Sequence, residues 1–365
     1  MIKGHGGNIY DAARQLGCRP ADILDMSSNF NPLGPPPELM EHLQAALAAV
    51  KRLPEVDAGT LAEAYARNQG RLPGEILAGG GTTQFIYALP RALDSRRALI
   101  CGPTYADYRD ACAQQGVDAA FAMSGPETDF RHDPRKVARL AGEADLIFIC
   151  NPNNPTGVLW PEGEIQGLAR AHPDRWFVVD ESYLPMVPEG ERYSLIGWAA
   201  RDLPNVIVLD SCSKIYRIPG LRIGFLAAAE PVVERLKPLG LPWNVNGLAQ
   251  AAGAFLMSRH EELARFVAAT RSFLAAERKF MADGLADVPG LRLFPSHTSY
   301  LLLKLPRGIT ADRVCRGMLE KRILIRDCAN FKGLSNGYVR ISLKEHPDNA
   351  RGLQILREVL LHLSR

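Results

Sequence analysis

Short apolar runs alternate with amphipathic stretches along most of this chain. Five of the runs are rich in Val, Ile, Leu and Phe, and they cover residues 97–102, 145–150, 176–180, 205–211 and 222–229. A strand that is buried on both faces loses the polar alternation of a half-exposed strand, as in parallel sheets covered by helices. The pattern therefore predicts an α/β fold whose mostly parallel sheet is flanked by helices.

The pattern changes towards the C-terminus. Residues 250–285 carry a nearly continuous helical pattern, which is long enough to bridge two lobes. Strand-like runs and two further helical stretches follow, and this mixture predicts a smaller α+β unit. We expect four parts in chain order: an N-terminal segment over 1–50, a large domain over 51–245, a connecting helical region over 246–285 and a small domain over 286–365.

Composition and charge narrow the class of protein. The 365 residues carry a formal net charge of +3 with acidic and basic residues interspersed, so the basic stripe of a nucleic-acid-binding protein is missing. No apolar run reaches the roughly 18 residues of a membrane span, and the first residues lack the apolar core of a signal peptide. The seven cysteines lack CxxC spacing, which favours reduced thiols. We expect a cytoplasmic protein that binds neither nucleic acid, membrane nor metal.

Polar motifs follow four predicted strands, of which three are runs named above and the fourth is the short run EILA at 75–78. They are GGGTTQ at 79–84, NPNNPTG at 151–157, DESY at 180–183 and SCSK at 211–214. Each motif alone has an ordinary explanation, because asparagines form turns, carboxylates cap helices and glycines link elements. The carboxyl ends of parallel strands converge on one crevice, however, so we expect the four motifs to form one site.

Lys214 is the most informative residue of this set. Lysine is among the side chains least often buried, yet Lys214 stands between small hydroxyl residues and an arginine eight positions later, at the edge of two apolar runs. Desolvation destabilises its ammonium form, and a neutral amine attacks an aldehyde to form a Schiff base. We therefore predict that Lys214 binds an aldehyde cofactor covalently.

A phosphorylated aldehyde such as pyridoxal 5'-phosphate needs further partners. Its phosphate needs a helix N-terminus, hydroxyl groups and a guanidinium. Its ring nitrogen needs a buried carboxylate that keeps it protonated, and its phenolic oxygen needs hydrogen-bond donors. The sequence offers Gly81, Thr82, Thr83, Ser211, Ser213 and Arg222 for the phosphate, Asp180 for the ring nitrogen, Tyr183 and Asn154 for the phenolic oxygen, and Tyr105 as an aromatic lid.

Several segments resemble a known superfamily. The stretches SCSKIYRIPGLRIGF, NPNNPTG, VVDESY and PTYADY resemble the motifs of the fold-type I pyridoxal-phosphate enzymes, the aspartate aminotransferase superfamily. The resemblance runs over essentially the whole chain. It implies a large domain with a mostly parallel seven-stranded sheet, an N-terminal segment that packs on the small domain and active site, and a homodimer. It assigns Lys214, Asp180, Tyr183, Asn154 and Arg222 to the cofactor roles above, and it adds Arg340 for the substrate carboxylate.

Other segments are similar to a narrower group. The stretches HGGNIYDAARQLG, SSNFNPLG, LPWNVNGLA and RILIRDCANFKGL are most similar to the threonine-phosphate decarboxylases of cobalamin biosynthesis, relatives of the histidinol-phosphate aminotransferases. This similarity implies decarboxylation of L-threonine O-3-phosphate to (R)-1-amino-2-propanol phosphate. A phosphorylated amino acid has two anionic ends, so separate cationic groups should meet them. We assign Arg340 to the carboxylate, Arg326 with Lys332 to the phosphate, and His5, Asn31 and Asn154 to further substrate contacts.

Some residues depart from the superfamily pattern. Leu53 stands where relatives have a tyrosine that reaches a phosphate across the dimer interface, and leucine cannot donate a hydrogen bond. The glycine turn reads Gly79-Gly80-Gly81 and is followed by Gln84 in place of the usual Asn and Glu. The sequence leaves three alternatives open: a histidinol-phosphate or related aminotransferase, a decarboxylase of another phosphoamino acid such as serine phosphate, and a non-catalytic ligand-sensing module.

Overall fold

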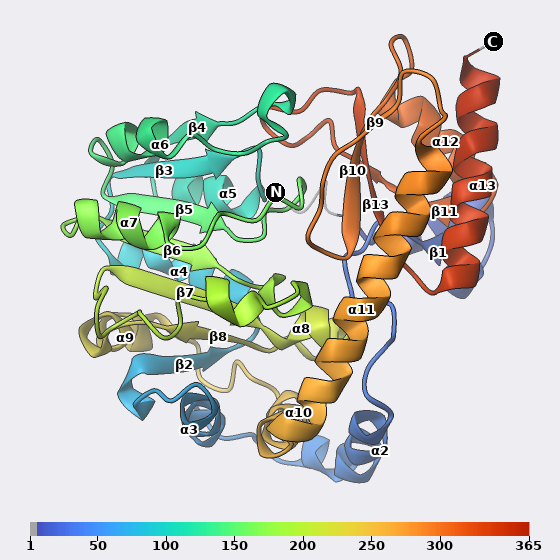
Figure 1. Cartoon of the computed structure of the whole chain (residues 1–365). Coiled ribbons are helices and arrows are strands. Elements are labelled where there is room, and N and C mark those ends of the chain that lie inside the picture. The colour runs from blue at the N-terminus through green and yellow to red at the C-terminus, as the bar shows by residue number, and fades with distance from the viewer. Residues whose placement is uncertain (1–5, 365) are drawn as a thin grey trace.

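The computed structural model of the protein describes residues 6–364, and its larger part is built on a seven-stranded sheet (Figure 1). The strand order is β2-β8-β7-β6-β5-β3-β4. Strand β8 is antiparallel to both of its neighbours and all other pairs are parallel, so the predicted mostly parallel sheet is confirmed. The strands are β2 (Ile76–Gly79), β3 (Arg97–Gly102), β4 (Asp118–Met123), β5 (Leu146–Cys150), β6 (Trp176–Asp180), β7 (Val206–Ser211) and β8 (Gly224–Ala227).

Helices cover both faces of this sheet, and each face has its own hydrophobic core. Alternate strand residues divide between the cores, with Leu99 and Ile147 on one side and Ile100 and Phe148 on the other. Burial on both sides explains the continuous apolar runs of the sequence. One face packs against α3 (Gly59–Asn68), α6 (Pro134–Ala141), α7 (Glu164–Ala171) and α10 (Gly247–Ser258), and the other against α4 (Thr82–Ala92), α5 (Asp107–Gln114) and α9 (Glu230–Leu236).

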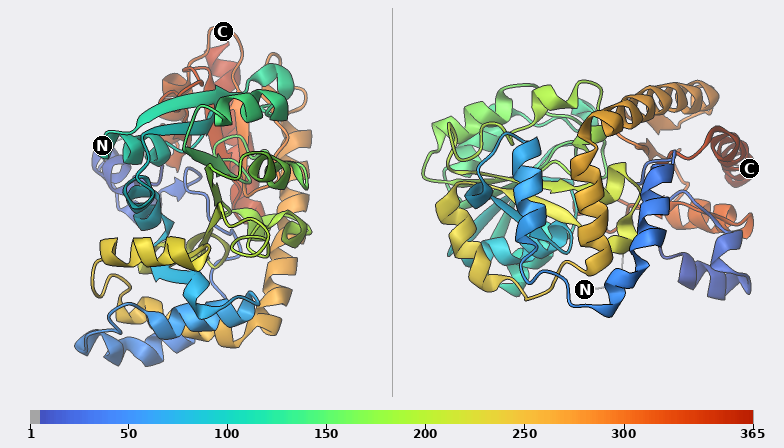
Figure 2. Two further views of the ribbon diagram at one scale, coloured as in Figure 1. Left: turned by 90° about the vertical axis from the view of Figure 1, so that its left-hand side faces the viewer. Right: turned by 90° about the horizontal axis from the view of Figure 1, so that it is seen from below.

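The C-terminal elements gather at one end of the molecule (Figure 1; right-hand panel of Figure 2). They form a four-stranded antiparallel sheet with the order β12-β13-β10-β9. The elements are α11 (His260–Leu285), β9 (Arg292–Leu293), β10 (Tyr300–Lys304), α12 (Ala311–Glu320), β12 (Arg326–Asp327), β13 (Tyr338–Ser342) and α13 (His346–Leu363). Among the described residues, no helix combines the length and the apolar character that a membrane span needs.

The region expected as a long connecting helical region consists of two helices. Helix α10 ends at Ser258, Arg259 interrupts the helical conformation, and α11 begins at His260. Helix α10 packs into a core of the large sheet, whereas α11 contributes Leu274 and Met281 to the core of the small sheet. Apart from Leu263 near the start of α11, which still packs into the core of the large sheet, the two helices therefore belong to different cores.

The N-terminal segment joins the two parts of the molecule. Its elements are α1 (Ile9–Leu16), β1 (Leu24–Asp25) and α2 (Pro37–Ala45), and β1 pairs in parallel with β11 (Ile323–Leu324) of the C-terminal part. Beyond β1, the backbone N–H of Asn31 donates to the carbonyl oxygen of Lys214 at 3.0 Å. Residues 24–31 thus run from the small domain to the short helix α8 (Cys212–Ile215).

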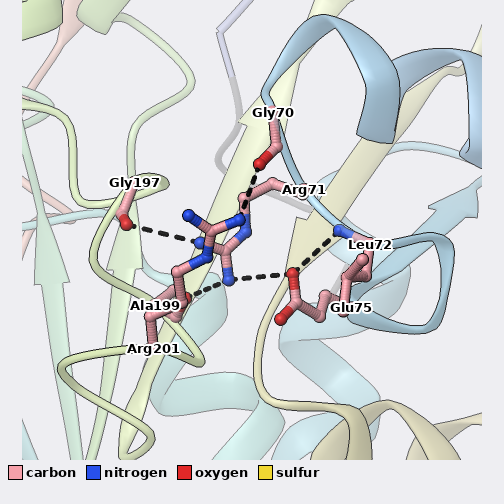
Figure 3. Close-up of polar contacts among 7 residues, drawn as sticks. All are labelled: Gly70, Arg71, Leu72, Glu75, Gly197, Ala199 and Arg201. Carbon is pink, nitrogen blue, oxygen red and sulfur yellow. Dashed lines mark hydrogen bonds and ion pairs between the residues drawn. The ribbon is translucent and has the colours of Figure 1, made fainter.

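Arg71 fastens the end of α3 to the loop between β6 and β7 (Figure 3). Its buried guanidinium donates to the carbonyl oxygens of Gly197, at 3.3 Å, and Ala199, and it forms an ion pair with Glu75 at 3.0 Å. The carboxylate of Glu75 also accepts the backbone N–H of Leu72 at 3.0 Å. We call these contacts of Arg71 the Arg71 clip. It holds α3 against the sheet through charged groups that are shielded from water.

Candidate active site

The carboxyl ends of β5, β6 and β7 open into one cavity that contains Lys214. The N-terminus of α4 faces the same cavity. Its lining residues are Gly81, Thr82, Thr83, Tyr105, Tyr108, Cys150, Asn154, Asp180, Ser182, Tyr183, Ser211, Ser213, Lys214 and Arg222. They include every residue that the sequence assigns to the cofactor. Within residues 6–364, no group of three His, Cys, Asp or Glu side chains could hold a metal ion.

Lys214 lies on the one-turn helix α8, directly after β7. Ser211 caps this helix, since its hydroxyl accepts the backbone N–H of Ser213 at 3.3 Å. The partly buried side chain of Lys214 places Nζ 5.0 Å from the ring centre of Phe30 and 5.9 Å from that of Tyr183. The amine is therefore enclosed by aromatic rings rather than exposed on the surface.

The surroundings of Lys214 favour its neutral form. Burial lowers the pKa of Lys214 to about 8. The positive charges of Arg222 and Arg340 act in the same direction, and the charge of Asp180 opposes them. An uncharged amine is the form that adds to an aldehyde, so the site prepares Lys214 for this reaction.

Asp180 is held in place at the end of β6. It is 6% exposed, its Oδ2 accepts the hydroxyl of Tyr108 at 2.8 Å, and its Oδ1 accepts the backbone N–H of Ser182 at 3.0 Å. Burial and then the charge of Asp180 raise the pKa of Tyr108, so this phenol stays a donor. Sequence reasoning missed Tyr108, although it follows Tyr105 by three residues, a spacing that places both side chains on one face of a helix.

The other end of the cavity is rich in hydrogen-bond donors. Helix α4 begins at Thr82, and the residue before it, Gly81, has a φ of 95° that side chains with a β-carbon disfavour. A Cβ built on Gly81 would lie 2.5 Å from Nη2 of Arg222. The free N–H groups of the helix, the hydroxyls of Thr82 and Thr83 and a guanidinium thus line one end of the cavity, and this donor set fits the phosphate of pyridoxal 5'-phosphate.

Gln84 supports the glycine turn in front of α4. Its Oε1 accepts the backbone N–H of Gly80 and the side-chain Nδ2 of Asn244, each at 2.9 Å. The glutamine that departs from the superfamily pattern therefore still supplies an acceptor that holds the turn.

A second cavity adjoins the first. It is lined by Gly6, Ser27, Ser28, Asn29, Phe30, Tyr105, Ala106, Asn154, Tyr183, Lys214, Arg326, Asn330, Phe331 and Arg340. Four of these residues, Tyr105, Asn154, Tyr183 and Lys214, also line the first cavity. A molecule in the second cavity would therefore meet Lys214 at the boundary between the two.

Arg340 places a buried positive charge in the second cavity. Only 4% of the residue is exposed, and its Nη2 donates to the carbonyl oxygen of Ser27 at 2.7 Å. Its Nη1 donates to Oδ1 of Asn154, and its Nε lacks a partner among the described residues. Because a buried charge requires compensation, Arg340 is suited to bind an anionic group of a ligand.

Arg326 adds a second cationic group to this cavity. Its Nη2 donates to Oδ1 of Asn330 at 2.7 Å. Burial, followed by the charge of Arg340, lowers the pKa of Arg326. Gly6 lies beside both arginines, since a Cβ built there would be 3.4 Å from Cδ of Arg326 and 3.5 Å from Nη2 of Arg340. Two guanidinium groups in one pocket favour a ligand with two negative charges.

Asn31 and Lys332 lie outside the residues that line the two cavities, and their assignment to the substrate stays a prediction. The Nδ2 of Asn31 donates to the carbonyl of Ile215 and to Oγ1 of Thr270, both at 2.8 Å, so the amide is already engaged. Lys332 is exposed, and its Nζ lies 4.0 Å from the ring centre of Phe121. The remaining substrate assignment, His5, lies outside the described residues.

Asn29, which the sequence did not single out, lies at the second cavity. It lines the second cavity and is 4% exposed. Its Oδ1 accepts the hydroxyl of Ser342 at 2.6 Å, and its Nδ2 donates to the phenolic oxygen of Tyr183 at 3.4 Å. The amide orientation is therefore set by Ser342, and its donor side faces the cavity.

The family model of aminotransferase class I and II matches residues 21–356 of this chain. The chain belongs to this family, and thus to the fold-type I pyridoxal-phosphate enzymes that its motifs resemble. A threonine-phosphate decarboxylase from Salmonella typhimurium is 34% identical over 98% of this chain and 96% of its own length. A histidinol-phosphate aminotransferase from Methanococcus aeolicus is 27% identical over 97% of this chain and 95% of its own length.

Solved structures agree with this assignment. The crystal structure of L-threonine-O-3-phosphate decarboxylase from Porphyromonas gingivalis has a TM-score of 0.82 and 31% identity, covering 94% of this chain and 100% of that chain. The histidinol-phosphate aminotransferase from Sinorhizobium meliloti, solved in complex with pyridoxal-5'-phosphate, has a TM-score of 0.85 at 22% identity, covering 98% of this chain and 95% of that one. The second likeness concerns the fold alone.

Proposed function

We propose that this protein is a pyridoxal-phosphate-dependent decarboxylase of L-threonine O-3-phosphate that serves cobalamin biosynthesis. The observation that carries the proposal is the pair of guanidinium groups, Arg340 and Arg326, in a cavity that shares Lys214 with the cofactor cavity. A phosphorylated amino acid has two anionic ends and one amine, and this arrangement offers a partner to each. The similarity to two threonine-phosphate decarboxylases over nearly the whole chain supports the same substrate.

The first cavity supplies the groups that hold and tune the cofactor. When bound, pyridoxal 5'-phosphate provides an aldehyde that links to amines and a protonated ring that accepts the electrons of a breaking bond. The carboxylate of Asp180, oriented by Tyr108, holds the proton of the ring nitrogen. The N-terminus of α4, Ser211, Ser213 and Arg222 bind the phosphate, and Tyr105 covers the ring.

The second cavity supplies the groups that hold the substrate. Arg340 binds the α-carboxylate, Arg326 binds the phosphate, and the amide of Asn29 contacts the substrate between them. Lys214, with its pKa lowered to about 8, carries a proton on Nζ and gives it to the α-carbon once carbon dioxide has left. By holding both anionic ends of the substrate, Arg340 and Arg326 would decide which bond of its α-carbon is presented to the cofactor, and so would select the reaction.

Product analysis tests this proposal. The purified holoprotein is incubated with threonine phosphate and no keto acid, and released carbon dioxide and aminopropanol phosphate are measured. We expect both products in equal amounts, and we expect Lys214→Ala to yield neither. Parallel reactions contain serine phosphate, or histidinol phosphate with a 2-oxo acid. Faster turnover of histidinol phosphate with the oxo acid would overturn the proposal in favour of an aminotransferase.

We also propose that the protein acts as a homodimer in the cytoplasm. Large apolar side chains are exposed on the segment from α2 to α3 and on the loop before α10: Met40, Leu47, Val50, Leu53, Val56, Leu241 and Trp243. The backbone N–H of Trp243 donates to the carbonyl of Val56 at 2.8 Å, so the two stretches adjoin. Adjoining exposed apolar side chains are typical of a protein interface.

The seven cysteines are unpaired, as expected for a reducing compartment, and this supports the cytoplasmic location.

Sedimentation of the holoprotein tests the dimer. Leu53 is 74% exposed in the chain, and Leu53→Asp is expected to weaken dimerisation at least about tenfold, because a carboxylate at the contact must lose its water. The matched control is Leu361→Asp, since Leu361 is 55% exposed on the distant helix α13. A monomeric wild-type protein at micromolar concentration would refute this part of the proposal.

A further inference from the structure

A chain of hydrogen bonds lies directly behind the turn that carries Lys214. Asp210 is the last residue but one of β7, and its Oδ1 accepts the backbone N–H of Ser211 at 2.7 Å. Its Oδ2 accepts the hydroxyl of Tyr65, on helix α3, at 2.7 Å. Ser211 in turn caps helix α8 through the N–H of Ser213. The chain of hydrogen bonds therefore connects α3 to the turn of Lys214.

Tyr65 is held rigidly at the far end of this chain. It is 2% exposed, and its ring stacks on Phe225 with 3.8 Å between the ring centres and 10° between the planes. Phe225 is the residue that pairs with Asp210 between β8 and β7. The Arg71 clip fixes the end of α3, three residues beyond the helix, against the loop between β6 and β7 (Figure 3). The hydroxyl of Tyr65 is thus presented to Asp210 without reorganisation.

Ser211 separates two cavities. One is the cofactor cavity, and the other lies behind the turn and is lined in part by Tyr65, Glu181 and Asp210. Neither Tyr65 nor Asp210 lines the cofactor cavity. Burial raises the pKa of Asp210, and the hydrogen bond from Tyr65 opposes this shift. Without that hydroxyl, the carboxylate would gain a proton more easily or turn towards the rear cavity, and either change weakens its bond to Ser211.

We propose that Tyr65 and Asp210 are a positioning pair, which holds the Ser211–Lys214 turn where the amine of Lys214 meets the cofactor. The pair touches neither cofactor nor substrate and acts only through Ser211. The inference rests on the proposed function, because it takes Lys214 as the residue that binds the cofactor. Since a displaced nucleophile loses rate rather than affinity, the pair should affect kcat more than KM.

Two measurements on variants test the pair. Tyr65→Phe removes one hydroxyl and keeps the stacking on Phe225, so we expect kcat for carbon dioxide release to fall about tenfold while KM stays within about twofold. The second measurement uses the apoprotein, in which acylation of Lys214 is followed against pH by peptide mass spectrometry. We expect the midpoint to move upwards by about half a pH unit or more, because a looser turn returns water to the ammonium group.

Variants of Asp210 test whether the two residues act as one unit. Asp210→Ala removes both hydrogen bonds, and the double variant with Tyr65→Phe should be no worse than Asp210→Ala alone. Asp210→Asn keeps an acceptor for the N–H of Ser211 and should retain more activity than Asp210→Ala. If Asp210→Ala does not fold, Asp210→Asn is used in its place. The control is Tyr338→Phe, which removes the hydroxyl of a buried tyrosine in the small domain and should leave kcat and the acylation midpoint unchanged.

The possible results distinguish a failure of the positioning-pair hypothesis from a failure of the proposed function. An unchanged acylation midpoint in Tyr65→Phe would overturn the pair, because only stability would then depend on the hydroxyl. Effects of Tyr65→Phe and Asp210→Ala that add in the double variant would overturn it as well. If the wild type releases no carbon dioxide but the midpoint shifts as expected, the proposed function fails and the pair stands, since acylation needs neither cofactor nor substrate.

Discussion

Burial of Lys214 leads to a quantitative prediction about how the apoprotein captures an aldehyde. The pKa of Lys214 is lowered from 10.5 to about 8. At pH 7 an amine with the lower pKa is about 9% neutral, whereas an ordinary lysine is about 0.03% neutral, a ratio of about 300. Capture by Lys214 should therefore be about 300-fold faster at neutral pH than capture by a surface lysine of equal intrinsic reactivity.

The pH dependence distinguishes this prediction from ordinary lysine chemistry. The rate should rise about tenfold between about pH 7 and 9 and then level off, because the amine is then almost wholly neutral. For an unshifted lysine the rate would rise about 100-fold over the same interval and continue to climb. The assay is stopped-flow absorption of the apoprotein mixed with pyridoxal, which lacks the phosphate and avoids its titration.

The amine of Lys344 must be removed before the pH dependence of the capture rate is assigned to Lys214. Burial also lowers the pKa of Lys344 to about 8, and its Nζ donates to the carbonyl oxygen of Ser28 at 3.1 Å. The measurement is therefore made in a Lys344→Arg background, with Lys214→Arg as the blank. A rate that still climbs tenfold per pH unit at about pH 9.5 would refute the reasoning, because the amine would then have an ordinary pKa.

Three further predictions follow from the structure. Lys214→Met should stabilise the apoprotein by about 3 kcal/mol at pH 7 in urea unfolding, because the folded chain no longer bears a desolvated ammonium group, and this gain should vanish as the pH rises from 8 to 10.5. Arg326→Gln should lower kcat/KM for threonine phosphate at least about 100-fold, whereas Lys332→Gln should change it less than about threefold, measured by carbon dioxide release. Arg71→Met should destabilise the fold by about 3 kcal/mol in the same unfolding assay, because Glu75 is left buried without its cation.

The central strands could be predicted because they are buried on both faces. Every residue of β5 is buried, and the apolar run in the sequence reflects this directly. Strand β4 escapes the pattern, since it is an edge strand and most of its residues alternate between exposed and partly buried positions. The antiparallel direction of β8 cannot be read from its apolar run, because a strand covered on both faces buries the same side chains in either direction.

The residues of the first cavity, proposed to hold the cofactor, were easier to predict than those of the second cavity, proposed to hold the substrate. The reason lies in the topology of the sheet. Residues that follow parallel strands must meet at one edge of the sheet, so Asp180, Ser211 and Lys214 could be grouped without knowing any distance. The substrate cavity is assembled from the N-terminal segment and the small domain, whose packing no local pattern specifies. Asn29 and Asn31 are therefore indistinguishable in the sequence, and only the structure shows that Asn29 lines the second cavity whereas the amide of Asn31 binds Ile215 and Thr270.

The residues behind the site, Tyr65 and Asp210, could not be assigned a role from the sequence at all. Tyr65 lies in the core stripe of α3, where its ring alone accounts for its burial, and Asp210 looks like the polar end of a strand. Nothing in the spacing connects a helix residue to a strand residue 145 positions away, although their side chains share one hydrogen bond. Such contacts come from tertiary packing, so they become visible only when α3 and β7 are seen together in the structure.

The division of the site between two parts of the molecule bears on how its chemistry is chosen. The residues proposed to activate the cofactor lie on the large sheet, and those proposed to bind the substrate lie on the N-terminal segment and the small sheet. Decarboxylases and aminotransferases both resemble this chain over nearly its whole length. If both use the same cofactor cavity, the outcome depends on which bond of the substrate the second cavity turns towards the ring. Exchange of residues 24–31 and 322–332 between such relatives should therefore alter the ratio of decarboxylation to transamination, while the pH dependence of aldehyde capture by Lys214 stays the same.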